Sequence, residues 1–418
     1  MNKKKHKKNF WSRLGPGLIT GASDDDPSGI ATYSQVGASF GLSALWTALV
    51  TFPLMAAVQE MCARIGIVTK EGLTGTLRKN YPRWVLYTML LFSVPAIVMN
   101  IGADIASMGA VGNMLFPSIH AGFFSVAFTL GLLYMMIYFS YRKFSAILKY
   151  LCLSLLVYLI VPFLYKQDFS AILGATFVPK IKWNGEYLNL LVAILGTTIS
   201  PYLFFWQANM EAEEIKQHKN YLIVDKRIIN DMRIDIDSGM LFSNIVMFFI
   251  MLTSGTVLFN SGLHHIDTVE EAARALKPLA GQNAYLLFAI GVIGTGCLAI
   301  PVLSGSVSYI FAETFGFSNG FDKKYHEAKA FYIVIAISLL VGLSLNYIGI
   351  SPIQALIYSA VLYGLTAPVL IGIILHISNN KTVMKENVNG KISNWLGILT
   401  LILMGLAAIA LLYFQFIK

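Results

Sequence analysis

Residues 15–41 read GPGLITGASDDDPSGIATYSQVGASFG, and this stretch decides the fold. It is long enough to cross a bilayer, yet three aspartates and a proline stand in its middle, from Asp24 to Pro27. A charged side chain at the bilayer centre costs at least roughly 2.5 kcal/mol, so the three must face a cavity that holds water or an ion. Pro27 removes a backbone donor and disfavours helical geometry at Asp26, so we expect the helix to break there.

A second apolar segment, residues 190–210, carries the same kind of interruption between Gly196 and Pro201, five predicted helices later. Pro201 alone would indicate only a kink. Two interrupted helices at matching positions of two halves, however, are typical of an inverted-repeat transporter with its site at the midplane. An unwound helix exposes carbonyl oxygens, and the end of the first half-helix carries a negative partial charge, so both features predict a cation as the substrate.

The composition places the whole chain in a membrane. Its 418 residues are 56% hydrophobic and 13% charged, with a mean hydropathy of +0.65. Apolar runs of roughly 20 residues recur from end to end. We predict an all-α integral membrane protein of about eleven transmembrane helices, near residues 13–39, 43–67, 84–112, 121–140, 144–165, 188–211, 236–261, 284–312, 328–348, 352–377 and 393–416.

These helices predict a single transmembrane domain that covers residues 1–418. Its expected parts are a basic cytoplasmic tail (1–12), a first five-helix repeat (13–165), a second five-helix repeat (188–377) and an additional eleventh helix (393–416).

Basic residues predict the orientation, because loops rich in Lys and Arg stay cytoplasmic. Of the 31 Lys and Arg residues, only six fall on the side opposite the N-terminus: Lys166, Lys180, Lys182, Arg274, Lys277 and Lys418. We therefore expect a multi-pass protein of the cell membrane with its N-terminus cytoplasmic and its C-terminus outside. The net charge of +9 then favours contact with anionic lipid headgroups, and nothing indicates nucleic-acid binding.

At these motifs the chain resembles the natural resistance-associated macrophage protein (NRAMP) family of divalent metal transporters. Residues 15–38 match the start of that family, while QEMCARIGIVTKEGL (59–73) and ADIASMGAVG (103–112) resemble its helix 2 and helix 3 segments. The resemblance implies a leucine-transporter-type fold with a 5+5 inverted repeat, and a metal held between broken helices 1 and 6.

The resemblance also implies a set of metal-binding positions. Asp26 stands at the family's metal-binding aspartate, Gly29 where its asparagine ligand would be, and the carbonyl of Thr197 where a backbone ligand would be. Gln354 in helix 10 is expected to match a glutamine that reaches the ion. Beside them, Asp24 and Asp25 could hold a hydrated ion through water, face the cavity mouth, or accept from a protein donor.

Three departures from the family pattern bear on the substrate. Ser200 occupies the methionine position, Tyr202 the histidine position and Ser107 the helix 3 glutamate position, while Asp104 is retained. Without the thioether the site is all oxygen, which favours hard cations, and fewer direct ligands suit Mg²⁺ because that ion keeps several waters. Tyr202, Ser107 and Asp104 belong to the family's proposed proton route, and a tyrosine cannot replace a histidine that titrates near neutrality.

The chain is thus identified as a member of a divergent NRAMP-related branch associated with Mg²⁺. We predict a secondary transporter of divalent cations by alternating access, for Mg²⁺ and also Mn²⁺, without proton coupling. The alternative is a proton-coupled Mn²⁺/Fe²⁺ transporter of the ordinary NRAMP type, in which Ser200 and Tyr202 are packing substitutions. Either reading needs no cofactor; the expected partners are divalent metal ions and the lipid bilayer, with no obligatory protein partner.

Three other classes fit the sequence less well. An amino-acid symporter would place a substrate carboxylate beside three aspartates. A receptor would need a soluble output domain, and the chain ends at Lys418 directly after the last predicted helix. An enzyme is not expected, because no nucleotide-binding loop, metal-histidine motif or nucleophile elbow is present.

Overall fold

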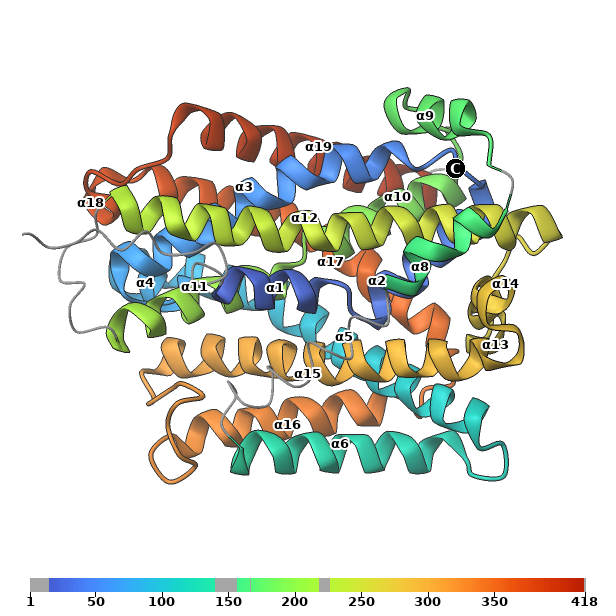
Figure 1. Ribbon diagram of the computed structural model, residues 1–418. Coiled ribbons are helices and arrows are strands. Elements are labelled where there is room, and N and C mark those ends of the chain that lie inside the picture. Colours follow the sequence, from blue (N-terminus) through green and yellow to red (C-terminus); the bar gives the residue numbers. More distant parts are fainter. Residues whose placement is uncertain (1–14, 140–155, 166, 218–225, 417–418) are drawn as a thin grey trace, which may run out of the picture.

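The computed structural model describes residues 15–139, 156–165, 167–217 and 226–416, and all regular structure within them is helical. The basic tail (1–12) and most of the predicted fifth helix (144–165) lie outside the described residues. The described end of that fifth segment forms α8 (Val157–Ile160) and the 3₁₀ turn η3 (Val161–Leu164). The long helices run side by side as one bundle, with shorter helices at its two ends (Figure 1).

The long helices follow the order that the hydropathy predicts. The first half of the chain supplies α1 (Pro16–Asp24), α2 (Pro27–Phe40), α3 (Trp46–Thr69), α5 (Arg83–Leu115) and α6 (Ala121–Tyr138). The second half supplies α10 (Gly185–Thr198), α11 (Pro201–Gln217), α12 (Lys226–Val257), α15 (Ala284–Phe315), α16 (Lys329–Leu345), α17 (Pro352–Asn379) and α19 (Lys391–Phe416).

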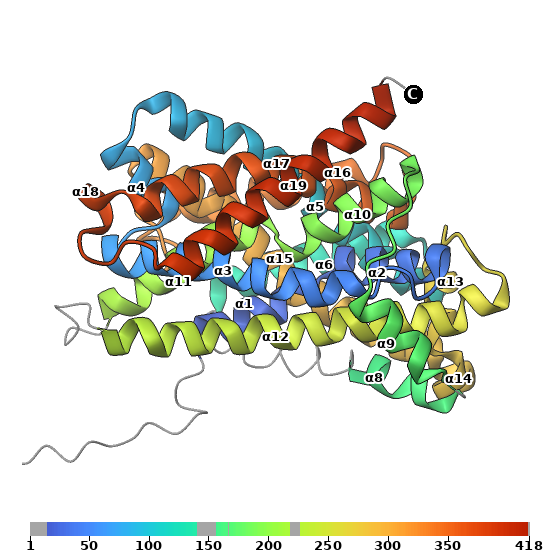
Figure 2. The same cartoon turned by 90° about the horizontal axis from the view of Figure 1, so that it is seen from above.

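Short helices and turns occupy the connections. They are α4 (Leu73–Asn80), α9 (Phe169–Phe177), η4 (Phe259–Ser261), α13 (Val269–Ala273), η5 (Arg274–Leu276), α14 (Lys277–Ala280), η6 (Gly281–Asn283) and α18 (Lys381–Met384). Figure 2 shows α4 and α18 at one end of the bundle and α9, α13 and α14 at the other.

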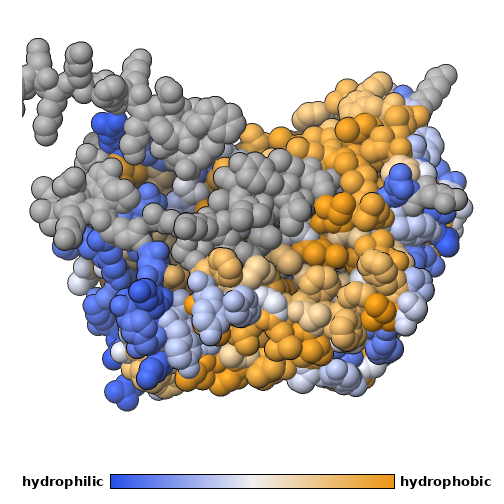
Figure 3. Space-filling model, turned by 60° about the horizontal axis from the view of Figure 1, so that its bottom comes forward, coloured by the Kyte–Doolittle hydropathy of each residue, from blue (hydrophilic) through white to orange (hydrophobic). Residues whose placement is uncertain are grey.

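Eight helical segments of the described residues are long and apolar enough to cross a membrane, with α10 and α11 counted together. Helix α16 is a shorter apolar helix, the broken pair α1 and α2 corresponds to the first predicted crossing, and most of the fifth predicted helix lies outside the described residues. Figure 3 shows an apolar band across the middle of the molecule with hydrophilic residues at both ends. This surface is what a membrane-spanning bundle requires.

The seventh predicted helix (236–261) begins earlier in the structure than hydropathy predicts. The corresponding helix α12 starts at Lys226, ten residues before the predicted start. Its first turns carry Asp231, Arg233 and Asp235. Hydropathy detects only the part of a helix that suits lipid, whereas charged residues still form helix beyond that part. The helix therefore extends past the apolar stretch.

Both predicted breaks are present. Helix α1 ends at Asp24, and Asp26 is the N-cap of α2 with extended backbone geometry (ψ 172°), followed by Pro27 as the first helical residue. Helix α10 ends at Thr198 and α11 begins at Pro201. Proline suits the first position of a helix because it has no N–H to satisfy there. In contrast, prolines such as Pro53 and Pro301 lie inside continuous helices.

Helix α12 runs along both halves of the first broken helix (Figure 2). Two glycines let the backbones touch: a Cβ built on Gly21 would lie 2.2 Å from the carbonyl oxygen of Gly239. The Asp235 carboxylate also accepts from the backbone N–H groups of Gly15 and Gly17 at 2.7 and 2.6 Å, at the start of α1. It thereby satisfies donors that a helix start leaves unpaired, so α1 is docked on α12 along its length.

Candidate functional site

The three aspartates lie buried where the first helix is interrupted. Asp24, Asp25 and Asp26 are exposed by 0%, 1% and 1%, respectively. Among the ion pairs of the described residues, none involves any of the three. Buried carboxylates are ordinarily paired with a cation or fully hydrogen-bonded, so this concentration of acidic groups calls for a partner from outside the chain.

Asp26 is held at both carboxylate oxygens. Its Oδ1 accepts from the backbone N–H of Gly29 at 2.8 Å, as an N-cap residue does. Its Oδ2 accepts from the side-chain amide of Asn100, on α5, at 2.8 Å. The Ser359 hydroxyl, on α17, donates to the amide oxygen of Asn100 at 2.7 Å. A chain of hydrogen bonds therefore fixes Asp26 from three helices.

Asp24 and Asp25 share one protein donor. The hydroxyl of Ser243, on α12, lies 2.7 Å from Asp24 Oδ2 and 3.2 Å from Asp25 Oδ1. The other oxygens, Asp24 Oδ1 and Asp25 Oδ2, are buried and have no hydrogen-bond partner among the described residues. Ionised carboxylate oxygens can only accept hydrogen bonds, so these two atoms need a water molecule that donates to them, a bound proton or a cation.

Residues of the second break meet those of the first. The Thr197 and Ser28 hydroxyls lie 3.3 Å apart, and a Cβ built on Gly29 would lie 3.5 Å from Thr197 Oγ1. The Ser200 hydroxyl donates to the Thr197 carbonyl at 2.5 Å. A carbonyl has two lone pairs, so the predicted backbone ligand retains one of them.

Tyr202 joins the two broken helices directly. Its hydroxyl donates to the carbonyl oxygen of Ser23, in the last turn of α1, at 2.8 Å. Its ring lies 5.8 Å from that of Tyr363 on α17, and both side chains are fully buried. The side chain at the family's histidine position therefore satisfies one of the carbonyls that the end of α1 leaves free.

Asp104 lies about one turn beyond Asn100 on α5, and Ser107 lies about two turns beyond it. The Ser107 hydroxyl donates to the backbone carbonyl of Asp104 at 2.8 Å, so it makes a local bond within the helix. The Asp104 side chain is fully buried, and neither of its oxygens has a hydrogen-bond partner in the part of the chain that the structure describes. Asp104 lies four residues after Asn100, the residue that donates to Asp26.

Gln354 lies in the first turn of α17, where its backbone N–H is 3.3 Å from the Ser351 hydroxyl. The α17 residue that joins the Asp26 network is Ser359, five positions further along, or about 7.5 Å of helix rise. Gln354 is half-buried, and no hydrogen bond given for the described residues links its side chain to Asp26. Its role as a ligand stays a prediction.

Sequence reasoning missed Asn100 and Ser243, which donate to the aspartates, and Ser359, which donates to Asn100. Each is a single polar residue in an apolar helix, and its partner lies 74 or more positions away in the chain. The sequence signal for these residues is only the general rule that buried polar groups form hydrogen bonds.

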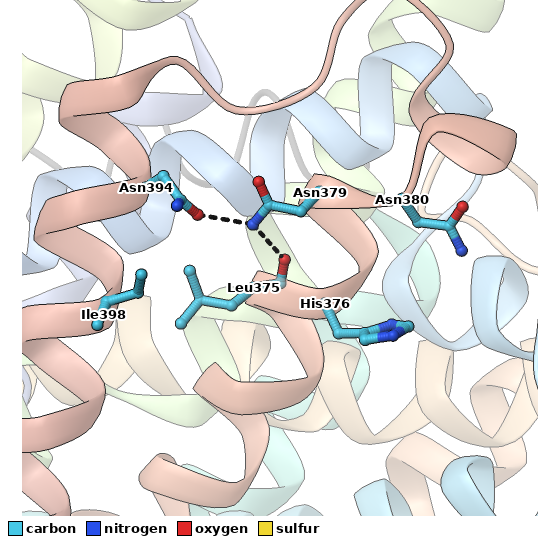
Figure 4. Close-up of a pocket in the computed structure, with 6 residues that line it drawn as sticks. All are labelled: Leu375, His376, Asn379, Asn380, Asn394 and Ile398. Carbon is cyan, nitrogen blue, oxygen red and sulfur yellow. Dashed lines mark hydrogen bonds between the residues drawn. The ribbon is translucent and has the colours of Figure 1, made fainter.

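Within the described residues, no group of three or more His, Cys, Asp and Glu side chains is arranged to hold a metal ion on its own. An ion at the breaks would therefore take single carboxylates together with carbonyl, hydroxyl and water oxygens. A separate pocket of about 460 Å³ between α17 and α19 is lined by His376, Asn379, Asn394 and others (Figure 4). It lies at the far end of α17 from Ser359 and is not part of this site.

Solved structures with the same helix arrangement identify the fold. The chain superposes on a manganese transporter of Eremococcus coleocola with a TM-score of 0.75, at 17% identity and over 99% of this chain and 88% of that one. It also superposes on Mhp1, a nucleobase-cation-symport-1 family transporter in a closed conformation, with a TM-score of 0.61, at 14% identity and over 99% and 93% of the two chains. The fold is of the leucine-transporter type, with two broken helices at its centre.

The sequence defines the family. Residues 17–414 match the model of the natural resistance-associated macrophage protein-like family, and the chain belongs to that family. Similar relatives are the "Divalent metal cation transporter MntH" proteins of Caldanaerobacter subterraneus, 25% identical over 94% of this chain and 90% of the relative, and of Clostridium acetobutylicum, 26% identical over 96% and 91%. This family consists of multi-pass membrane transporters.

Proposed function

We propose that this chain is a secondary transporter that carries divalent metal cations across the cell membrane by alternating access. We further propose that Mg²⁺ is its main substrate, that Mn²⁺ is also accepted, and that protons do not move with the ion. Membership of the family and the names of its relatives support the divalent cation. The preference for Mg²⁺ and the absence of proton coupling are argued from the residues of the site.

One observation carries the proposal. Three buried aspartates stand together at a helix break, and two of their oxygens have no partner among the described residues. The end of α1 adds a negative partial charge at the same place. Negative groups and unpaired acceptors that face one another inside a protein favour a divalent cation, either bare or with its water shell.

The donor atoms support a hard cation. Around the breaks, the side chains placed by the structure offer carboxylate and hydroxyl oxygens, and Ser200 stands where the family has its methionine. Mg²⁺ prefers oxygen ligands and retains several waters, so it needs few direct contacts. The acceptors Asp24 Oδ1 and Asp25 Oδ2 are then available to the hydrogens of those waters.

Two contacts support transport without protons. The Tyr202 hydroxyl donates a hydrogen bond to the backbone carbonyl of Ser23, and the Ser107 hydroxyl donates one to a carbonyl of its own helix. Neither side chain exchanges protons near neutral pH, as the histidine and glutamate of the family pattern could. The retained Asp104 is the one carboxylate left at the positions of that route.

We also propose that the N-terminus is cytoplasmic and the C-terminus outside. Eleven helices, the number that the sequence predicts, would leave the two ends on opposite sides, and the excess of Lys and Arg on the N-terminal side supports this orientation.

Ion flux into proteoliposomes tests the proposal, with Mg²⁺, Mn²⁺ and Ca²⁺ compared and a pH dye inside. The variant Asp26→Asn removes the charge at the break and keeps an N-cap residue, since asparagine caps helices about as well as aspartate. The matched control is Asp168→Asn, which changes the exposed N-cap of α9 in the same way.

We expect Mg²⁺ uptake in the wild type and in the Asp168 control, loss of uptake in Asp26→Asn, and no internal acidification. Mn²⁺ uptake with acidification and without competition from Mg²⁺ would contradict the proposal and support the proton-coupled alternative. Absence of flux for all three ions would contradict divalent cation transport altogether.

A further inference from the structure

Asn100 is a buried polar residue that contacts Asp26 directly and to which the sequence assigned no role. It lies in the middle of α5 and is 0% exposed. Its Nδ2 donates to Asp26 Oδ2 at 2.8 Å, and its Oδ1 accepts from the Ser359 hydroxyl at 2.7 Å. Since a carboxylate can only accept, the nitrogen of the amide must face Asp26.

The Asn100 amide is significant because Gly29 has no side chain that could contact an ion. The resemblance places the family's asparagine ligand at Gly29, which has no side chain. In the structure a different asparagine, Asn100 on α5, contacts the Asp26 carboxylate, and Ser359 fixes the orientation of the Asn100 amide. The contact differs in kind, since the Asn100 nitrogen donates to Asp26.

Asp26 is consequently restrained at both oxygens, by Asn100 on one and by the Gly29 N–H on the other. A carboxylate held in this way cannot turn to suit a larger ion, and each oxygen has about one lone pair left. Such a group suits Mg²⁺, which is bound through one or two carboxylates and its own waters. It suits Ca²⁺ poorly, because Ca²⁺ takes more direct oxygen ligands, including bidentate carboxylates.

We infer that Asn100 is a positioning residue that sets the cation specificity of the site: by holding Asp26 it favours Mg²⁺ over Ca²⁺. The inference rests on the proposed function. Removal of the amide releases Asp26 Oδ2 while Oδ1 still accepts from the Gly29 N–H, so the carboxylate can tilt about that remaining bond and offer both oxygens to a larger ion. The selectivity for Mg²⁺ then falls even where the amount of folded protein does not change.

The experiment compares Asn100→Ala with the wild type in proteoliposomes and measures the half-saturating concentrations of Mg²⁺ and Ca²⁺. We expect the ratio between the two ions to shift toward Ca²⁺ by about tenfold, the effect of one hydrogen bond to a charged group. The matched control is Asn209→Ala, which removes a buried asparagine of α11 whose amide donates to the Phe205 carbonyl at 2.9 Å. It should leave the ratio unchanged.

A second variant, Ser359→Ala, keeps Asn100 and removes only the group that orients it, so it tests the inference if Asn100→Ala does not fold. We expect a smaller shift of the ratio in the same direction. An equal loss for both ions, with an unchanged ratio in both variants, would show a merely structural role and overturn the inference while the proposed function stands. A wild type that moves neither ion would overturn both.

Discussion

The hydroxyl of Tyr202 donates a hydrogen bond of 2.8 Å to the carbonyl oxygen of Ser23, so the second half of one broken helix is tied to the end of the first half of the other. Ser23 is adjacent to the three aspartates in sequence, and Tyr202 follows the proline of the second break. This bond bridges the two interruptions on which alternating access depends in folds of this type.

The variant Tyr202→Phe tests the importance of this bond. We expect a loss of about 1 kcal/mol of stability, because the Ser23 carbonyl loses a buried donor, together with reduced flux. Thermal unfolding in detergent and Mg²⁺ flux measure the two effects. Tyr158→Phe is the control, since the buried Tyr158 hydroxyl has no hydrogen-bond partner among the described residues. If both variants behave alike, the bond has no special role.

The variant Ser200→Met restores the thioether of the family pattern. We expect the preference to move from Mg²⁺ toward Mn²⁺ and Cd²⁺, because sulfur favours softer cations. Competition of each ion against Mg²⁺ uptake measures the change. Ser200→Thr, which keeps a hydroxyl able to donate to the Thr197 carbonyl, should retain the wild-type order of ions. An unchanged order in the methionine variant would show that this position does not face the ion.

The variant Gly21→Ala tests the close packing of α1 on α12. Its Cβ would stand 2.2 Å from the Gly239 carbonyl oxygen, so α1 must move away, at a cost of about 1 to 3 kcal/mol. We expect a lower unfolding temperature and loss of flux. Gly131→Ala, on α6, is the control because nothing lies within 4 Å of its added Cβ. It should be neutral or slightly stabilising, and similar behaviour of the two variants would refute the packing argument.

The variant Asp104→Asn separates the two views of proton coupling. If protons do not move with the ion, removal of this buried carboxylate should leave Mg²⁺ flux within about twofold of the wild type, since neither of its oxygens has a partner among the described residues. Flux and internal pH measure the outcome. A flux that loses its dependence on an imposed pH gradient only in this variant would instead identify Asp104 as a proton carrier.

The sequence allowed prediction of the features that have a local cause. An apolar segment that contains three aspartates and Pro27 is not expected to form a continuous helix in lipid, and the helix is interrupted at these residues, between Asp24 and Pro27. The helix order follows from hydropathy for the same reason. Proline by itself was a poorer guide, because Pro53 and Pro301 lie within unbroken helices.

The partners of the aspartates could not be predicted in this way. Ser243 and Asn100 are ordinary polar residues within apolar helices, and nothing near them in sequence indicates that they face Asp24 and Asp26. Their pairing depends on how distant helices pack, which periodicity and composition do not specify. The same limit applies to Gln354, because the sequence predicts its helix but not which residue of that helix meets the Asp26 network.

The burial of the three aspartates has a consequence for the speed of ion movement. Each is exposed by 1% or less, so an ion at this site could exchange with neither side of the membrane in this conformation. A protein that passes through such a state moves a fixed number of ions in each cycle of helix rearrangement. Its transport rate is then limited by the rate of that conformational change and saturates at high ion concentration, unlike the diffusion-driven current of an open pore.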